Sequence, residues 1–91
     1  MKVAFFEIQG WENSILRRGL GKINTFHEPL DLSNVSKVKD FQVISVFIYS
    51  KITEEVLKKL PKLKLIVTRS TGFDHIDFKA CAKRKIKVFN I

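Results

Sequence analysis

The sequence has little cysteine and no long apolar run, the features that mark disulfide-bonded, zinc-binding, membrane and secreted proteins. Its 91 residues include one cysteine, Cys81, so no internal disulfide can form and the paired spacing of a zinc site is missing. No apolar stretch approaches the roughly 20 residues of a membrane span, and the start MKVAFFEIQG lacks a hydrophobic signal core followed by a small-residue cleavage site. We therefore expect a cytoplasmic protein with no membrane partner and no metal, folded as one compact domain.

Acidic residues are scarce in the last third of the chain. Residues 1–57 carry 7 basic and 7 acidic side chains, whereas residues 58–91 carry 10 basic and 2 acidic, so the net charge of +8 arises there. The basic residues cluster in KKLPKLK (58–64) and KRK (83–85), where helices are predicted to end and cations favour the negative end of the helix dipole. The aromatic interleaving of nucleic-acid modules is missing. A solvated basic face therefore explains the charge better than a nucleic-acid partner, whose binding would weaken steeply with salt.

The hydrophobic pattern predicts strands that alternate with helices. Short apolar runs predict five strands, at residues 1–8, 22–28, 41–49, 63–68 and 86–91. Apolar residues at helical spacing predict helices at Asn13–Leu20, within 31–41, at 53–60 and at Phe78–Lys85. Thr53 and Asp77 are suited to cap the last two helices. This alternation is typical of an α/β, flavodoxin-like three-layer sandwich, with a five-stranded parallel sheet in the order 2-1-3-4-5 and helices on both faces.

A polar, glycine-centred turn, TRSTGFDHID (68–77), follows the fourth predicted strand. Ligands of open parallel sheets bind outside the carboxyl ends of the strands, near the point where strand order reverses. Gly72 permits close approach of a ligand to the backbone, and the N–H groups of Ser70, Thr71 and Gly72 can form a concave site for a carboxylate. The residues alone leave open a second interpretation, in which this is an ordinary glycine turn without a ligand.

Residues 63–91 also carry a family pattern: an apolar strand, Arg-Ser, a variable residue, Gly, an apolar residue, Asp, His, an apolar residue, Asp, a helix, and a strand ending in Asn. This pattern resembles the end of the first segment of the substrate-binding domain in NAD-dependent D-2-hydroxyacid dehydrogenases, and most of all the D-lactate dehydrogenases among them. The matching positions are Arg69, Ser70, Gly72, Phe73, Asp74, His75, Ile76, Asp77 and Asn90. Upstream, VISVFIY followed by TEEVLKKLPKLKLI extends the resemblance, so that residues 1–91 correspond to one N-terminal substrate-binding segment.

The resemblance implies roles for three residues in binding a small 2-hydroxy or 2-keto acid. The backbone N–H groups of Thr71 and Gly72 are expected to hold the substrate carboxylate, in the turn that begins at Ser70. Tyr49 is expected to line the pocket, and its size favours a small acid such as pyruvate, the keto acid of D-lactate. Three further residues of the motif are expected to support the loop: Arg69, Asp74 and His75.

Several parts of the family's machinery are missing from the sequence. It contains no G-x-G-x-x-G loop, and the resemblance places the catalytic arginine, acid and histidine outside it. We therefore expect no catalytic residue and no cofactor bound by this segment alone, with NAD held by a dinucleotide-binding domain of a longer protein. Without the family's closing C-terminal helix, the segment is expected to expose an apolar patch and to self-associate or form a homodimer. The alternative is a stand-alone flavodoxin-like binding or interaction module.

Overall fold

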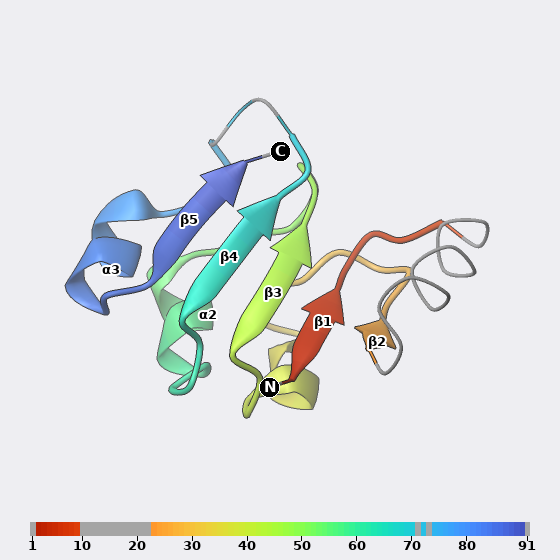
Figure 1. The fold of residues 1–91 in the computed structure, drawn as a ribbon, viewed down its shortest axis with the longest axis horizontal. Helices are drawn as coiled ribbons and strands as arrows, with labels where there is room; N and C mark the ends of the chain where they lie inside the picture. Colours follow the sequence, from red (N-terminus) through yellow and green to blue (C-terminus); the bar gives the residue numbers. More distant parts are fainter. Residues whose placement is uncertain (1, 10–22, 71, 73, 91) are drawn as a thin grey trace.

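A five-stranded parallel sheet organises the computed structural model, which describes residues 2–9, 23–70, 72 and 74–90 (Figure 1). The strands are β1 (Val3–Phe5), β2 (Asn24–Thr25), β3 (Val43–Val46), β4 (Leu65–Thr68) and β5 (Lys87–Asn90). They lie in the order β2-β1-β3-β4-β5, and every neighbouring pair is parallel. The predicted strand order is confirmed.

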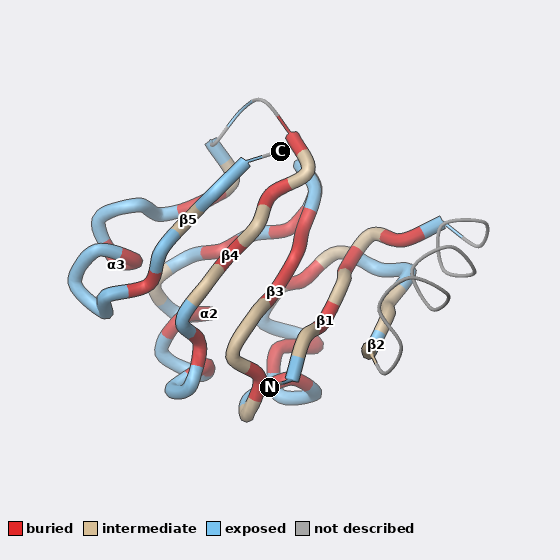
Figure 2. The backbone as a smooth tube through the Cα atoms, viewed as in Figure 1, coloured by how far each residue is buried: buried red, intermediate tan, exposed pale blue. Residues whose placement is uncertain are grey.

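Buried and half-buried residues alternate along β1 and β4 (Figure 2). Residues in register across the sheet share a face, because successive side chains of a strand point to opposite sides. On one face lie Ala4, Ile44 and Ile66, which are paired in register and completely buried. On the other face the corresponding residues, Val3, Val43 and Leu65, are only half-buried. One face of the sheet therefore carries the main core.

Three short helical segments cover the buried face. They are the 3-10 helix η1 (Val35–Val38), α2 (Glu54–Lys58) and α3 (Phe78–Lys83), and each contributes two buried residues to the core that contains Ala4, Ile44 and Ile66. One of these residues is Cys81, where burial, reinforced by Asp77, raises the pKa of the thiol to about 11. Cys81 therefore packs as a small buried hydrophobe of the core. The helix predicted at Asn13–Leu20 lies outside the described residues.

Both predicted helix caps are present. The Thr53 hydroxyl accepts a hydrogen bond from the Val56 backbone N–H at 3.3 Å, and the Asp77 carboxylate accepts one from the Ala80 N–H at 3.0 Å. Each cap satisfies a backbone donor that has no partner within its helix. Within the described part of the chain, no helix is long and apolar enough to cross a membrane.

The third strand is shorter than its apolar sequence predicts. The prediction placed a covered strand over residues 41–49, whereas β3 ends at Val46. The next three side chains are exposed by 36% at Phe47, 43% at Ile48 and 69% at Tyr49. The chain leaves the sheet here because backbone N–H groups of this segment donate to a carboxylate at the end of β1, described below, rather than to a neighbouring strand.

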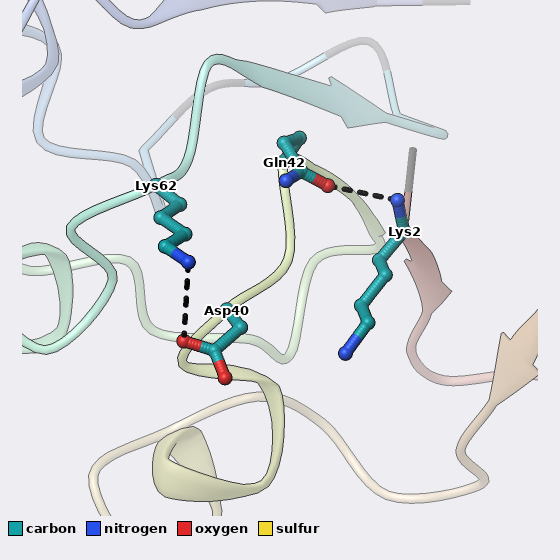
Figure 3. A network of polar contacts seen from close by, with 4 residues as sticks. All are labelled: Lys2, Asp40, Gln42 and Lys62. Carbon is teal, nitrogen blue, oxygen red and sulfur yellow. Dashed lines mark hydrogen bonds and ion pairs between the residues drawn. The ribbon is translucent and has the colours of Figure 1, made fainter.

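A set of polar contacts lies at the opposite end of the sheet, where the strands begin (Figure 3). The backbone N–H of Lys2 donates to the side-chain oxygen of Gln42 at 2.8 Å, and the Lys62 ammonium lies 4.0 Å from a carboxylate oxygen of Asp40. Both partners of the ion pair are substantially exposed, so it contributes little to stability. The amino-terminal end of the sheet is thus held mainly by its backbone ladder.

Candidate functional site

The strand order reverses between β1 and β3, since the chain continues from β1 to β2 on one side and later adds β3 on the other. Ligand sites of open parallel sheets lie at such a reversal, outside the carboxyl ends of the strands. Three segments meet there: residues 6–9 after β1, 47–51 after β3, and the turn that begins at Arg69 after β4. At this edge lie Tyr49, Ser70 and Gly72, the three described residues among those predicted to bind substrate.

A chain of hydroxyl groups holds the turn after β4. The Thr68 hydroxyl shares hydrogen bonds with Nε2 of His75 at 2.9 Å and with the Ser70 hydroxyl at 2.8 Å. The Ser70 hydroxyl in turn donates to the backbone carbonyl of Gly72 at 2.8 Å. Thr68 is completely buried and Ser70 is only 8% exposed. Ser70 therefore shapes the turn from inside, rather than presenting its side chain to a ligand.

Gly72 is exposed and has open space beside its backbone. Apart from its chain neighbours, no heavy atom lies within 4 Å of the position that a Cβ would take. Gly72 lines a cavity of about 260 Å³ together with Ile48, Lys51, Asp74 and His75. Packing within the described residues does not require a glycine here, so the open backbone is available for close approach of a ligand. Thr71, the other predicted carboxylate-binding residue, lies outside the described residues.

Tyr49 faces a different cavity from Gly72. Its side chain lines an apolar hollow of about 390 Å³ with Glu7, Gln9, His27, Pro29 and Phe47. Ile48, the preceding residue, lines the Gly72 cavity instead. The structure thus brings Ser70 and Gly72 together, and it places Tyr49 on the same edge of the sheet but beside a neighbouring cavity.

The three residues predicted to support the loop differ in what they contact. The Arg69 guanidinium donates to the Ser45 hydroxyl at 2.8 Å and to the backbone carbonyls of Phe6 and Glu7. It therefore ties the end of β4 to β3 and β1. His75 supports the turn through Thr68. Asp74 is exposed and lines the Gly72 cavity.

Two residues at this edge were not anticipated from the sequence. The Glu7 carboxylate accepts hydrogen bonds from the segment after β3, and Lys51 lines both the Gly72 cavity and an adjoining one of about 430 Å³. A single acid within the apolar run MKVAFFEI was the available signal for Glu7. Among the described residues, no group of three His, Cys, Asp or Glu side chains is placed to hold a metal ion.

The environment of His75 favours its neutral form. Burial lowers the pKa of the imidazole below its ordinary value of 6.5, and the positive charge of Lys51 adds to this effect. The negative charges of Glu7 and Asp74 act in the opposite direction, but they do not reverse the result. A neutral ring shares its Nε2 hydrogen bond with Thr68, so the turn is held by an uncharged hydrogen-bonded chain.

Lowering the pH should therefore destabilise the folded chain through His75. The unfolded chain takes up a proton at the ordinary histidine pKa, whereas the folded chain does so only at lower pH. The free energy of unfolding should consequently fall between about pH 7.5 and about pH 5.5. Urea titrations at several pH values measure this slope. His75→Asn should flatten it; a slope in His75→Asn equal to that of the wild type would contradict the prediction.

Comparison with known proteins identifies the family of this chain. A family model for the catalytic domain of the D-isomer specific 2-hydroxyacid dehydrogenases matches residues 3–91. The D-lactate dehydrogenase of Staphylococcus epidermidis is 30% identical over 96 residues, in an alignment that covers 99% of this chain and 29% of that enzyme. The glyoxylate reductase of Thermococcus litoralis is 34% identical over 56 residues, covering 62% of this chain and 17% of that enzyme.

A solved structure shows the same fold. The D-lactate dehydrogenase of Aquifex aeolicus, complexed with NAD and lactic acid, superposes with a TM-score of 0.92 and 37% sequence identity. The alignment covers 99% of this chain and 28% of that enzyme, so this chain spans less than a third of the length of the enzymes compared here. Because the family model matches nearly the whole sequence, the chain belongs to the D-isomer specific 2-hydroxyacid dehydrogenase family.

Proposed function

We propose that this chain is the N-terminal substrate-binding segment of an NAD-dependent D-2-hydroxyacid dehydrogenase that interconverts D-lactate and pyruvate. In this proposal the backbone N–H groups of Thr71 and Gly72 hold the substrate carboxylate. Ser70 shapes their turn, and Tyr49 lines the approach to the substrate site. The observation that carries the proposal is the open backbone of Gly72, in a turn held at the strand-order reversal by Ser70 and Thr68. The resemblance to two D-lactate dehydrogenases supports the choice of substrate.

The described residues do not fit a dinucleotide. A pyrophosphate site at the end of a strand needs a glycine-rich turn leading into a helix. The described turns after β1, β3 and β4 contain one glycine, Gly72, and the sequence has no G-x-G-x-x-G. We therefore assign NAD to a separate dinucleotide-binding domain of a longer protein, which also supplies the catalytic residues, and we expect this segment alone to be inactive.

The segment would act in the cytoplasm, with a small 2-hydroxy or 2-keto acid as its ligand and the dinucleotide-binding domain as its covalent partner. Nucleic acid and membrane are not among its partners. The half-buried face of the sheet, with Val43 and Leu65 at its centre, would support self-association of the segment or a homodimer of the full-length protein.

The full-length protein provides the test. We expect the purified enzyme to oxidise NADH with pyruvate, to act on D-lactate and not L-lactate in reverse, and to show a lower kcat/KM with glyoxylate and hydroxypyruvate. Residues 1–91 alone should show no activity under the same conditions. A preference for glyoxylate or hydroxypyruvate would contradict the substrate, and the absence of any keto-acid reduction would contradict the proposed function.

A blot of source-cell lysate with an antibody against residues 68–77 tests the alternative of a stand-alone module. A band of roughly 330 residues, two typical domains, supports the dehydrogenase. A band near 10.6 kDa would favour a small binding or interaction protein instead.

A further inference from the structure

Glu7 sits immediately after β1 in a backbone conformation that few side chains adopt. Its φ is 60°, in the left-handed region that favours glycine. Its backbone is nevertheless fixed on both sides. The Glu7 N–H donates to the Glu28 carbonyl at 3.1 Å, and the Arg69 guanidinium donates to the Glu7 carbonyl. These contacts hold the residue so that its side chain points across to the segment after β3.

The Glu7 carboxylate is surrounded by hydrogen-bond donors from that segment. One oxygen, Oε2, accepts from the Phe47 N–H at 2.8 Å, from the Ser50 N–H at 3.0 Å and from the Ser50 hydroxyl at 2.6 Å. The other, Oε1, accepts from the Tyr49 N–H at 3.0 Å. All four partners donate, so the site requires a group that only accepts. We call residues 47–50 the Glu7-bound loop.

Ser50 connects this loop to a third part of the chain. It is completely buried, and while its hydroxyl donates to Glu7 it accepts a hydrogen bond from the Leu30 N–H at 2.9 Å. The loop is therefore held at its end by a buried polar network, whereas the Ile48 and Tyr49 side chains project outward and are exposed. Both side chains thus belong to the segment whose backbone donates to Glu7.

We propose that Glu7 is a positioning residue for the substrate: through the Glu7-bound loop it holds Ile48 beside the Gly72 cavity and Tyr49 beside the neighbouring one. This inference rests on the proposed function, because it assigns the Gly72 cavity to the substrate carboxylate. Glutamine matches glutamate in size but replaces one accepting oxygen with an NH₂ donor, which would face a backbone N–H. Glu7→Gln should therefore release the loop even though the side chain keeps its length.

The test uses the full-length enzyme and measures steady-state kinetics together with backbone amide exchange. Glu7→Gln should raise KM for the keto acid roughly tenfold, a size consistent with losing hydrogen bonds to a charged group. KM for NADH should stay unchanged, and the amides of Phe47, Tyr49 and Ser50 should exchange faster. Glu28→Gln makes the same charge change at an exposed side chain and keeps the backbone carbonyl that accepts from the Glu7 N–H. Its KM values and amide exchange rates should match those of the wild type.

Glu7→Asp keeps a carboxylate, which only accepts hydrogen bonds, on a shorter side chain. Its KM for the keto acid should lie between those of the wild type and Glu7→Gln, and it provides the test if Glu7→Gln does not fold. Faster exchange with an unchanged keto-acid KM would overturn the positioning role, as would unchanged exchange. A wild-type enzyme that reduces no keto acid would instead refute the proposed function. In that case the exchange measurements still decide whether Glu7 holds the loop.

Discussion

Replacing Gly72 with alanine is expected to lower kcat/KM for the keto acid in the full-length enzyme by about a hundredfold, the effect typical of displacing a bound substrate by about 1 Å. The added methyl group would enter the space beside the turn, where the proposal places the substrate carboxylate. Most of the loss should appear as a higher KM for the keto acid, while KM for NADH stays unchanged.

The stability of the same variant separates this effect from misfolding. A Cβ at Gly72 meets no atom within 4 Å apart from its chain neighbours, so the free energy of unfolding should change by no more than about 0.5 kcal/mol. Chemical denaturation of wild type and variant provides the comparison. Retained activity would contradict the placement of Gly72 in the substrate site. A large loss of stability would show that the fold requires a glycine at this position.

Replacing Ile44 with alanine should lower the free energy of unfolding by about 2–5 kcal/mol. Ile44 lies in β3 between Ala4 of β1 and Ile66 of β4, and it is completely buried beneath the helical layer. Removing its outer carbons leaves a cavity that close-packed neighbours fill only in part. The loss is a large fraction of the roughly 5–15 kcal/mol that typically separates folded from unfolded domains.

An exposed residue supplies the matched control for this prediction. Leu32→Ala removes a similar volume from a side chain that is 52% exposed and should change stability by no more than about 0.5 kcal/mol. Urea unfolding of the three proteins, monitored by circular dichroism, makes the comparison. Similar losses at Ile44 and Leu32 would mean that the buried face of the sheet does not carry the main core.

Local sequence signals predicted most of the fold. The alternation of apolar runs with segments of helical spacing indicated a parallel sheet. The caps at Thr53 and Asp77 could be predicted because each lies three residues before the residue whose N–H it accepts. The glycine turn was likewise readable, because its glycine and polar residues are neighbours in the chain.

The conformation of the segment after β3 could not be predicted from neighbouring residues, because it depends on a contact between distant parts of the chain. Residues 47–49 continue an apolar run that is locally suited to a strand, but the backbone N–H groups of Phe47 and Tyr49 donate to a carboxylate about 40 residues away in the chain. A contact of that separation leaves no periodic trace in the sequence, so both the end of β3 and the role of Glu7 required the structure. The position of Tyr49 depends on the same contact, which is why its cavity was not anticipated.

The parallel pairing of the strands also has a consequence for how the chain folds. No two neighbouring strands can join through a tight hairpin, and the principal partner of β1 is β3, whose first paired residue is Val43 opposite Val3. The ladder between them requires closure of a long loop before any of its hydrogen bonds can form. We therefore expect slower folding than in a helical bundle of the same length. During synthesis, β1 is made about 40 residues before β3. Its apolar side chains therefore stay exposed to water until the later strands have been made.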